Sequence, residues 1–177
     1  MKTPKGLIGV VFAVLVVVIL GYLIINSSDT PLPEVSFSYL PPNGWTEERE
    51  IDSGIKYFPP SITNEESFAE ISVMEDIIPD NFTREKYLEE SERELIGLED
   101  YDYKLISHKK SIINGNETDE YIFTIKLGDT RIKQKQVIFI VNNKAFMFSY
   151  GSLENSFDRY LKDFDESLES IKILFPY

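Results

Sequence analysis

The chain has 177 residues, of which 42% are hydrophobic and 27% charged, a composition typical of a folded protein. It contains no cysteine and one histidine, His108, which excludes disulfides and thiolate metal sites and disfavours multi-histidine sites and Ser-His-Asp triads. A net charge of −12 argues against nucleic acid as a partner, because affinity for phosphates comes largely from clustered lysine and arginine. We therefore expect a non-catalytic protein that does not bind nucleic acid.

Residues 1–26 predict a cytoplasmic tip and a transmembrane helix that anchors the chain. Leu7 to Ile25 is an unbroken apolar stretch, about 28 Å long as a helix and close to the ~30 Å hydrocarbon core of a membrane. Lys2 and Lys5 lie on its N-terminal flank, so the positive-inside rule places that end in the cytoplasm and the remainder outside. A cleaved signal peptide is the alternative, but its apolar region is typically only about 7–15 residues long.

Residues 27–34 predict a short linker, extended by Pro31 and Pro33, and residues 35–177 predict one extracytoplasmic domain. Three Asn-X-Ser/Thr triplets are candidate glycosylation sites, at Asn26, Asn81 and Asn116. Unmodified turn asparagines are an equal alternative, because such triplets are common by chance.

In the first half of the domain we expect three strands and a helix. The strands cover 35–39, 55–58 and 68–74, and the first ends at Pro41-Pro42-Asn43-Gly44, directly before Trp45. An amphipathic helix is predicted over 84–98, with Thr83 as its N-cap.

The second half predicts two β-hairpins and a second helix. Strands over 103–113 and 117–127 flank Asn114-Gly115, and strands over 133–141 and 144–150 flank Asn142-Asn143. Tyr121, Phe123, Ile125 and Leu127 share one face, so we expect the sheet to be buried mostly on one side. An aromatic-rich helix follows over 156–170, and an apolar segment over 171–175. The fold class is α+β, with an antiparallel sheet packed against helices.

The segment from Phe37 through Pro41-Pro42-Asn43-Gly44 to Trp45 resembles the opening of PsbP-like domains. The early helix, the Asn114-Gly115 turn into an aromatic strand, and the late helix with Tyr160 and Phe164 are similar as well. The resemblance covers about residues 35–175 and implies an α/β/α sandwich that acts as a binding or assembly module. Members of this family include an accessory subunit of photosystem II, a Ran-binding nuclear-import factor and bacterial adaptors. The matching residues are turn and core positions, so no partner-contact residue carries over.

Charge is distributed unevenly along the exterior part. Residues 27–103 carry 20 acidic and 5 basic side chains, whereas residues 104–135 carry 7 basic and 4 acidic ones. The basic residues form a candidate interaction surface for an acidic partner or an anionic lipid surface, and they are Lys104, Lys109, Lys110, Lys126, Arg131, Lys133 and Lys135. The favoured alternative is that strand lysines keep the sheet soluble and prevent its edges from pairing with other chains.

Other candidate sites have simpler interpretations. Trp45 is expected to close the edge of the core, with contact to a ligand or partner as the alternative. Two acidic clusters, Glu47, Glu48, Glu50 and Asp52, and separately Glu99, Asp100 and Asp102, are weak Ca²⁺ candidates without EF-hand spacing. Solvated acidic surface is the favoured interpretation, so we expect no metal and no cofactor. His108 has no acid or nucleophile partner evident from the sequence.

Topology and composition together predict a membrane-anchored, extracytoplasmic binding module that acts on a protein complex of the cell envelope. A small-ligand or metal carrier, or a weak hydrolase with paired carboxylates in a cleft, is the alternative. A self-assembling surface component is a third hypothesis.

Overall fold

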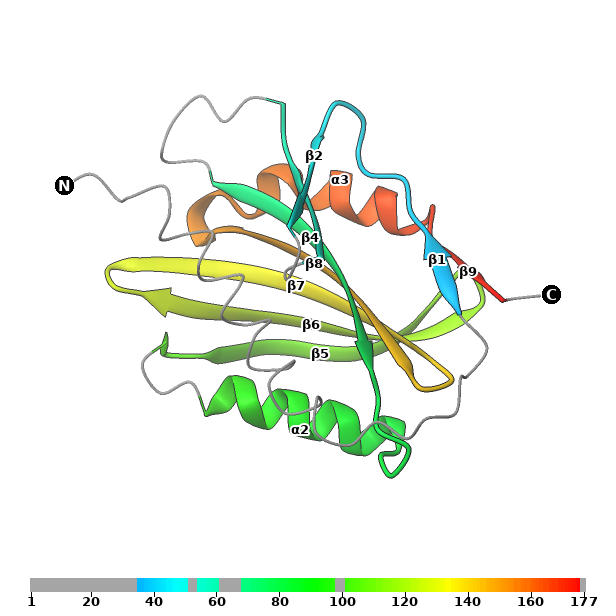
Figure 1. Cartoon of the computed structure of the whole chain (residues 1–177). Helices are drawn as coiled ribbons and strands as arrows, with labels where there is room; N and C mark the ends of the chain where they lie inside the picture. The colour runs from blue at the N-terminus through cyan, green and yellow to red at the C-terminus, as the bar shows by residue number, and fades with distance from the viewer. Residues whose placement is uncertain (1–34, 51–53, 61–67, 98–100, 176–177) are drawn as a thin grey trace.

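The computed structural model describes residues 35–50, 54–60, 68–97 and 101–175. At its centre lies a seven-stranded antiparallel sheet with the strand order β2-β3-β4-β8-β7-β6-β5 (Figure 1). Its strands are β2 (Thr46–Glu50), β3 (Gly54–Phe58), β4 (Ala69–Ile77), β5 (Lys104–Ile113), β6 (Asn116–Leu127), β7 (Thr130–Val141) and β8 (Lys144–Leu153). A separate pair, β1 (Ser36–Ser38) with β9 (Lys172–Leu174), joins the two ends of the domain.

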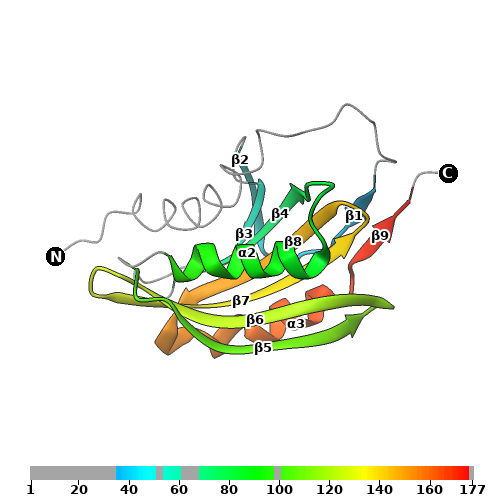
Figure 2. The ribbon, with the colours of Figure 1, turned by 90° about the horizontal axis from the view of Figure 1, so that it is seen from below.

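Helices cover both faces of the large sheet. α2 (Arg84–Ile96) packs on one face, and α3 (Asp158–Leu168), preceded by the short helix η2 (Glu154–Ser156), packs on the other (Figure 2). The expectation of a sheet buried mostly on one side is therefore wrong. The reason lies in β8, where Phe146 and Phe148 face α3 while Ala145 and Met147 face α2, so that both faces of the strand are apolar.

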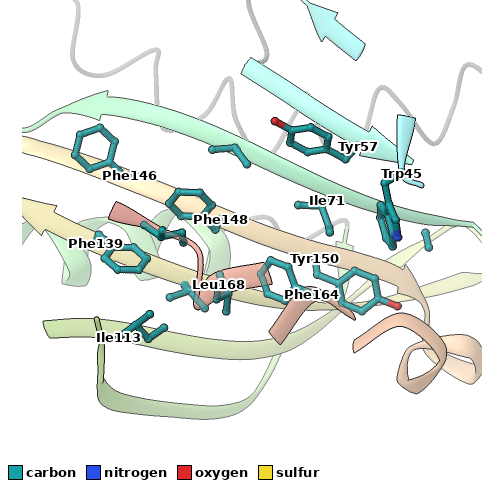
Figure 3. Close-up of a cluster of buried hydrophobic side chains, with 14 of the residues drawn as sticks. Trp45, Tyr57, Ile71, Ile113, Phe139, Phe146, Phe148, Tyr150, Phe164 and Leu168 are labelled. Atoms are coloured by element: carbon teal, nitrogen blue, oxygen red, sulfur yellow. The ribbon is translucent and has the colours of Figure 1, made fainter. Parts of the chain in front are cut away.

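The core under α3 is rich in aromatic side chains (Figure 3). Phe148 lies at its centre, with ring centroids 5.3 Å from Phe37 and 5.6 Å from Phe139 in edge-to-face geometry. Trp45 is only 9% exposed and meets the ring of Tyr160 at 5.6 Å. Trp45 thus packs at the edge of the core, as expected, and its contact with a ligand or partner stays a prediction.

The core under α2 depends on the way that helix begins. The Thr83 hydroxyl accepts a hydrogen bond from the backbone N–H of Lys86 at 3.2 Å, which caps the first turn as predicted. The helix then buries Tyr87, Leu88 and Leu95. Tyr87 donates its hydroxyl hydrogen to the buried carboxylate of Asp76 on β4, at 2.9 Å, and so ties the helix to the sheet.

Both predicted hairpins are confirmed, and their turns need left-handed backbone. Asn114 and Gly115 have φ values of 50° and 80°, and Asn142 has a φ of 55°, as turn asparagines and glycines tolerate. A third tight turn at Gly128 joins β6 to β7, so β5 to β8 form a continuous meander. Tyr121, Phe123 and Ile125 share the α2 face, as the alternation predicted.

One strand was missed. β2 has the sequence Thr-Glu-Glu-Arg-Glu and pairs along its whole length with β3, although the pattern led us to interpret it only as part of an acidic cluster. A strand with no apolar alternation gives no period-two signal, and here its pairing to β3 supplies the structure.

The predicted membrane span, Leu7 to Ile25, lies outside the described residues and stays a prediction. No helix among the described residues is both long and apolar enough to cross a membrane.

The buried Asp76 makes stability depend on pH. Burial raises the pKa of the Asp76 carboxyl above its usual value, even though it accepts hydrogen bonds from the Tyr87 hydroxyl and the Ile77 backbone N–H. The native state therefore binds this proton more tightly than the unfolded chain, and the stabilisation is lost as pH rises through the native pKa.

We expect the stability of Asp76→Asn, relative to that of the natural protein, to increase as the pH rises from about 4 to about 7, because only the natural protein loses the stabilising proton. Urea unfolding measures this difference. Asp129→Asn, the same substitution at an exposed position, is the control for the mutation itself. A flat or opposite slope for Asp76→Asn would contradict this account.

Candidate functional site

Six of the seven predicted basic residues lie on one face of the meander. Strand register places Lys104 and Lys133 opposite Thr124, Lys126 opposite Arg131, Lys135 opposite Ile122, and Lys109 opposite Glu120. Side chains that face one another across a ladder point to the same side of the sheet, and Lys135 contacts α3, which fixes that side as the α3 face. We call Lys104, Lys109, Lys126, Arg131, Lys133 and Lys135 the cationic face.

Lys110 is the exception. It lies opposite Asp119, whose neighbours on that face are Tyr121 and Phe123 of the α2 core, so Lys110 points to the other side. The prediction of a seven-residue surface is wrong at this position, because adjacent residues of a strand point to opposite faces.

Lys104, Lys109 and Lys126 of the cationic face are exposed because α3 covers only part of the sheet. Val137, Phe139 and Phe148 beneath the helix are fully buried, whereas the side chains of Lys104 and Lys109 are 61% and 63% exposed. Lys135 stands at the boundary: its ammonium lies 2.7 Å from Asp165 of α3 and 3.2 Å from Glu120.

Glu120 is the buried anion that organises one end of this face. It accepts a hydrogen bond from Ser111 and lies 3.2 Å from the ammonium groups of both Lys109 and Lys135. Burial alone would raise the pKa of Glu120, but the Ser111 hydrogen bond and the two ammonium groups outweigh it and lower that pKa below its usual value. The carboxylate therefore stays charged and keeps both lysines in place.

The other end is organised around Arg131. Its guanidinium donates to Asp102 at 2.6 Å and to Thr124 at 3.2 Å, and it lies 3.8 Å from Glu154. The Arg131 hydrogen bond lowers the pKa of the Asp102 carboxyl. Asp102 thus belongs to this ion-pair group.

Two cations remain available to a partner. Within the described residues, neither Lys126 nor Lys133 is in an ion pair; Lys133 instead lies over the ring of Phe157, 4.5 Å from its centroid. The face therefore presents at least two uncompensated positive charges, in addition to exposed Lys104 and Lys109.

His108 has an acid partner that the sequence interpretation missed. Its Nε2 donates to the completely buried Asp119 at 2.9 Å, and the other oxygen of that carboxylate accepts from Arg84 of α2 at 2.5 Å. The His108 ring stacks on Tyr121, with centroids 4.1 Å apart. The signal was present in the hairpin register, which sets His108 opposite Tyr121 and diagonal to Asp119. The group joins β5, β6 and α2, and no hydroxyl of the described residues is hydrogen-bonded to the ring.

The remaining candidate sites are the three glycosylation triplets and the two acidic clusters. Asn26 lies outside the described residues, Asn81 is exposed in the turn before α2, and Asn116 uses its amide to donate to the backbone oxygen of Asn114 at 3.2 Å. Glu47 and Glu48 lie on β2 and point to opposite faces of the sheet. Asp52, Glu99 and Asp100 lie outside the described residues, and among the described ones no group of three histidine or acidic side chains converges as a metal site requires.

Two clefts run along α3. One is lined by Asp158, Leu161, Lys162, Asp165, Glu166 and Glu169, and the other lies between α3 and the turn at residues 40–43. Both are open to solvent, and neither is an enclosed apolar pocket with two facing carboxylates, which the carrier or hydrolase alternative would need.

The Glu120 group generates a stability prediction opposite in sign to that for Asp76. Glu120→Gln should lower the free energy of unfolding by about 2 kcal/mol at pH 7, because hydrogen bonds to charged groups contribute about 1.5–3 kcal/mol each. The native pKa of Glu120 is lowered, so this stabilisation is present above its unfolded pKa near 4.5 and is lost as pH falls through the native value. Urea unfolding at pH 7 and pH 3 should show the difference shrinking at pH 3. Exposed Glu117→Gln is the matched control, and equal stability of Glu120→Gln and the natural protein at pH 7 would refute the role given to Glu120.

Comparison with known proteins identifies the fold. No protein-family model matches the sequence, and no curated protein is similar enough to count as a relative. Among solved structures, the cyanobacterial PsbP (CyanoP) of Synechocystis sp. PCC 6803 aligns over 85% of this chain and 99% of its own, with 14% identity and a TM-score of 0.59. LpqN, involved in cell envelope biogenesis of Mycobacterium tuberculosis, aligns over 84% and 88%, with 12% identity and a TM-score of 0.62. The Saccharomyces cerevisiae Ran-binding protein Mog1p aligns over 81% and 96%, with 9% identity and a TM-score of 0.53. The chain therefore has the PsbP-like fold that the resemblance implied.

Proposed function

We propose that this protein is a non-catalytic binding module whose cationic face docks on an acidic surface of a partner protein in the cell envelope. The observation that carries the proposal is the gathering of six basic side chains, three of them exposed, on one sheet face of a chain with a net charge of −12. A local reversal of charge against such a background directs a negatively charged partner to one orientation.

The arrangement of the cations suits protein recognition. Glu120, Asp102 and Asp165 hold Lys135 and Arg131 in place, so these side chains lose less conformational freedom when a partner binds. Lys126 and Lys133 supply charge that the described part of the molecule does not neutralise. A surface of fixed and free cations favours a folded acidic partner that offers carboxylates at defined positions.

The fold neighbours support a binding role without identifying the partner. Mog1p is described as Ran-binding, and LpqN as involved in cell envelope biogenesis. Fold likeness by itself assigns no function, so the proposal depends on the cationic face.

The location is part of the proposal. Leu7 to Ile25 would anchor the chain in the cell membrane, and the eight-residue linker over 27–34 would hold the domain close to its outer surface. A partner would then be a membrane-associated complex within reach of a short tether.

Charge reversal on the cationic face tests the docking. We expect Lys126→Glu with Lys133→Glu to reduce chemical cross-linking of the full-length protein to its partner in native membranes by about tenfold, since two reversed surface pairs are worth about 1–2 kcal/mol. Lys86→Glu with Lys162→Glu changes the net charge equally on the helices and should leave the cross-link intact.

Two results would contradict this docking. The first is undiminished cross-linking of the Lys126 and Lys133 double variant to the same protein. The second is that the natural protein forms no protein cross-link but binds vesicles of anionic lipid, and that the Lys126 and Lys133 double variant loses this vesicle binding. That result would make the membrane surface the partner.

Labelling of single cysteines tests the location. The natural chain has no cysteine, so an introduced one is its only thiol. In intact cells a membrane-impermeant maleimide should label Asn155→Cys, in the exposed helix η2, and should label Thr3→Cys only after the membrane is opened. Labelling of both, or of Thr3→Cys alone, would refute the proposed topology.

A further inference from the structure

The two edges of the large sheet carry opposite charges. β2 ends the sheet on one side and β5 ends it on the other (Figure 1). β2 exposes Glu47 and Glu48 together with Arg49, whose guanidinium lies 2.6 Å from Glu47, and β5 exposes Lys109 and Lys110. Each edge strand pairs with one neighbour in the sheet, and among the described residues no backbone hydrogen bond joins either of them to another segment. An unpaired edge presents a row of N–H and C=O groups to which another strand can add.

We propose that the chain assembles head to tail, with β2 of one copy adding to β5 of the next. A symmetric dimer through either edge would bring together two edges of the same net charge, which is unfavourable. The contact between unlike edges brings glutamates to lysines. Because such a contact is heterologous, it leaves one free edge of each kind and extends into chains of copies.

The strand register makes this contact specific. Six antiparallel steps separate β2 from β5, so the two strands run in the same direction within the sheet. A copy that continues the sheet with its helices on the same sides therefore pairs β2 with β5 in parallel.

Side-chain direction then selects the partners. Glu47 lies opposite Tyr57 and Lys109 opposite Glu120, so both point to the α3 side. Glu48 and Lys110 point to the α2 side. Setting Glu47 beside Lys109 also sets Glu48 beside Lys110, which gives one complementary pair on each face of the joined sheet.

This assembly shares Lys109 with the cationic face, but its test uses other residues than the docking test does. Lys126 and Lys133 lie on β6 and β7, inside the sheet, and take no part in the contact between edges. The variants that test the two proposals therefore do not overlap.

Disulfide trapping tests the contact in the full-length protein in its membrane. Differently tagged copies carrying Glu47→Cys and Lys109→Cys should form a disulfide-linked heterodimer on mild oxidation, because neighbouring strands lie about 4.8 Å apart, within the Cα separation that a disulfide spans. Glu47→Cys with Lys110→Cys is the matched control, since those side chains point to opposite faces. A chain with both Glu47→Cys and Lys109→Cys should form a ladder of oligomers, because its own edges lie six strand spacings, about 28 Å, apart.

Charge reversal provides a second readout. Glu47→Lys with Glu48→Lys should abolish chemically cross-linked oligomers, and so should Lys109→Glu with Lys110→Glu. A mixture of the two double variants should restore them, because each acidic edge again meets a basic one. Circular dichroism checks that each variant folds.

Three outcomes would overturn the proposal. They are equal trapping of the matched and mismatched cysteine pairs, predominant trapping of Glu47→Cys with itself, and failure of folded charge-reversed variants to associate when mixed.

Discussion

Strand β8 is the element on which the rest of the molecule depends, because it is hydrogen-bonded on both sides and buried on both faces. It pairs with β4 at one edge and β7 at the other, and every residue from 145 to 152 is buried. Phe146, Phe148 and Tyr150 form the base of the α3 core, while Ala145 and Met147 form that of the α2 core. A strand in this position must be apolar on both sides, and the run Ala-Phe-Met-Phe-Ser-Tyr meets that requirement.

Distance from β8 then decides what each part of the sheet does. Helix α3 covers the central strands and the end of β5 at Ile113, whereas Lys104, Lys109 and Lys126 on the outer strands stay exposed on the α3 side. Asp119 and Glu120 illustrate the division. Although they are neighbours in β6, Asp119 binds Arg84 and His108 on the α2 side, whereas Glu120 binds Lys109 and Lys135 on the other.

Local signals predicted local structure well. The turn at Asn114-Gly115 and the Thr83 cap were correct because the backbone conformations they need are properties of a few adjacent residues. Strand β2 was missed because its residues have no apolar pattern and form a strand through pairing with β3. Burial of the sheet on both sides was also missed, since alternation within a strand assigns residues to faces without showing whether a second helix covers the other face.

The sequence by itself determined the hairpins, the amphipathic helices and the concentration of basic residues between 104 and 135, because each follows from residues close together in the chain. Only the tertiary structure decided that six of those residues share a face while Lys110 does not, and that His108 meets Asp119. It also set an acidic strand and a basic strand at opposite edges of one sheet. These outcomes depend on strand register and strand order, which result from packing between segments far apart in the chain.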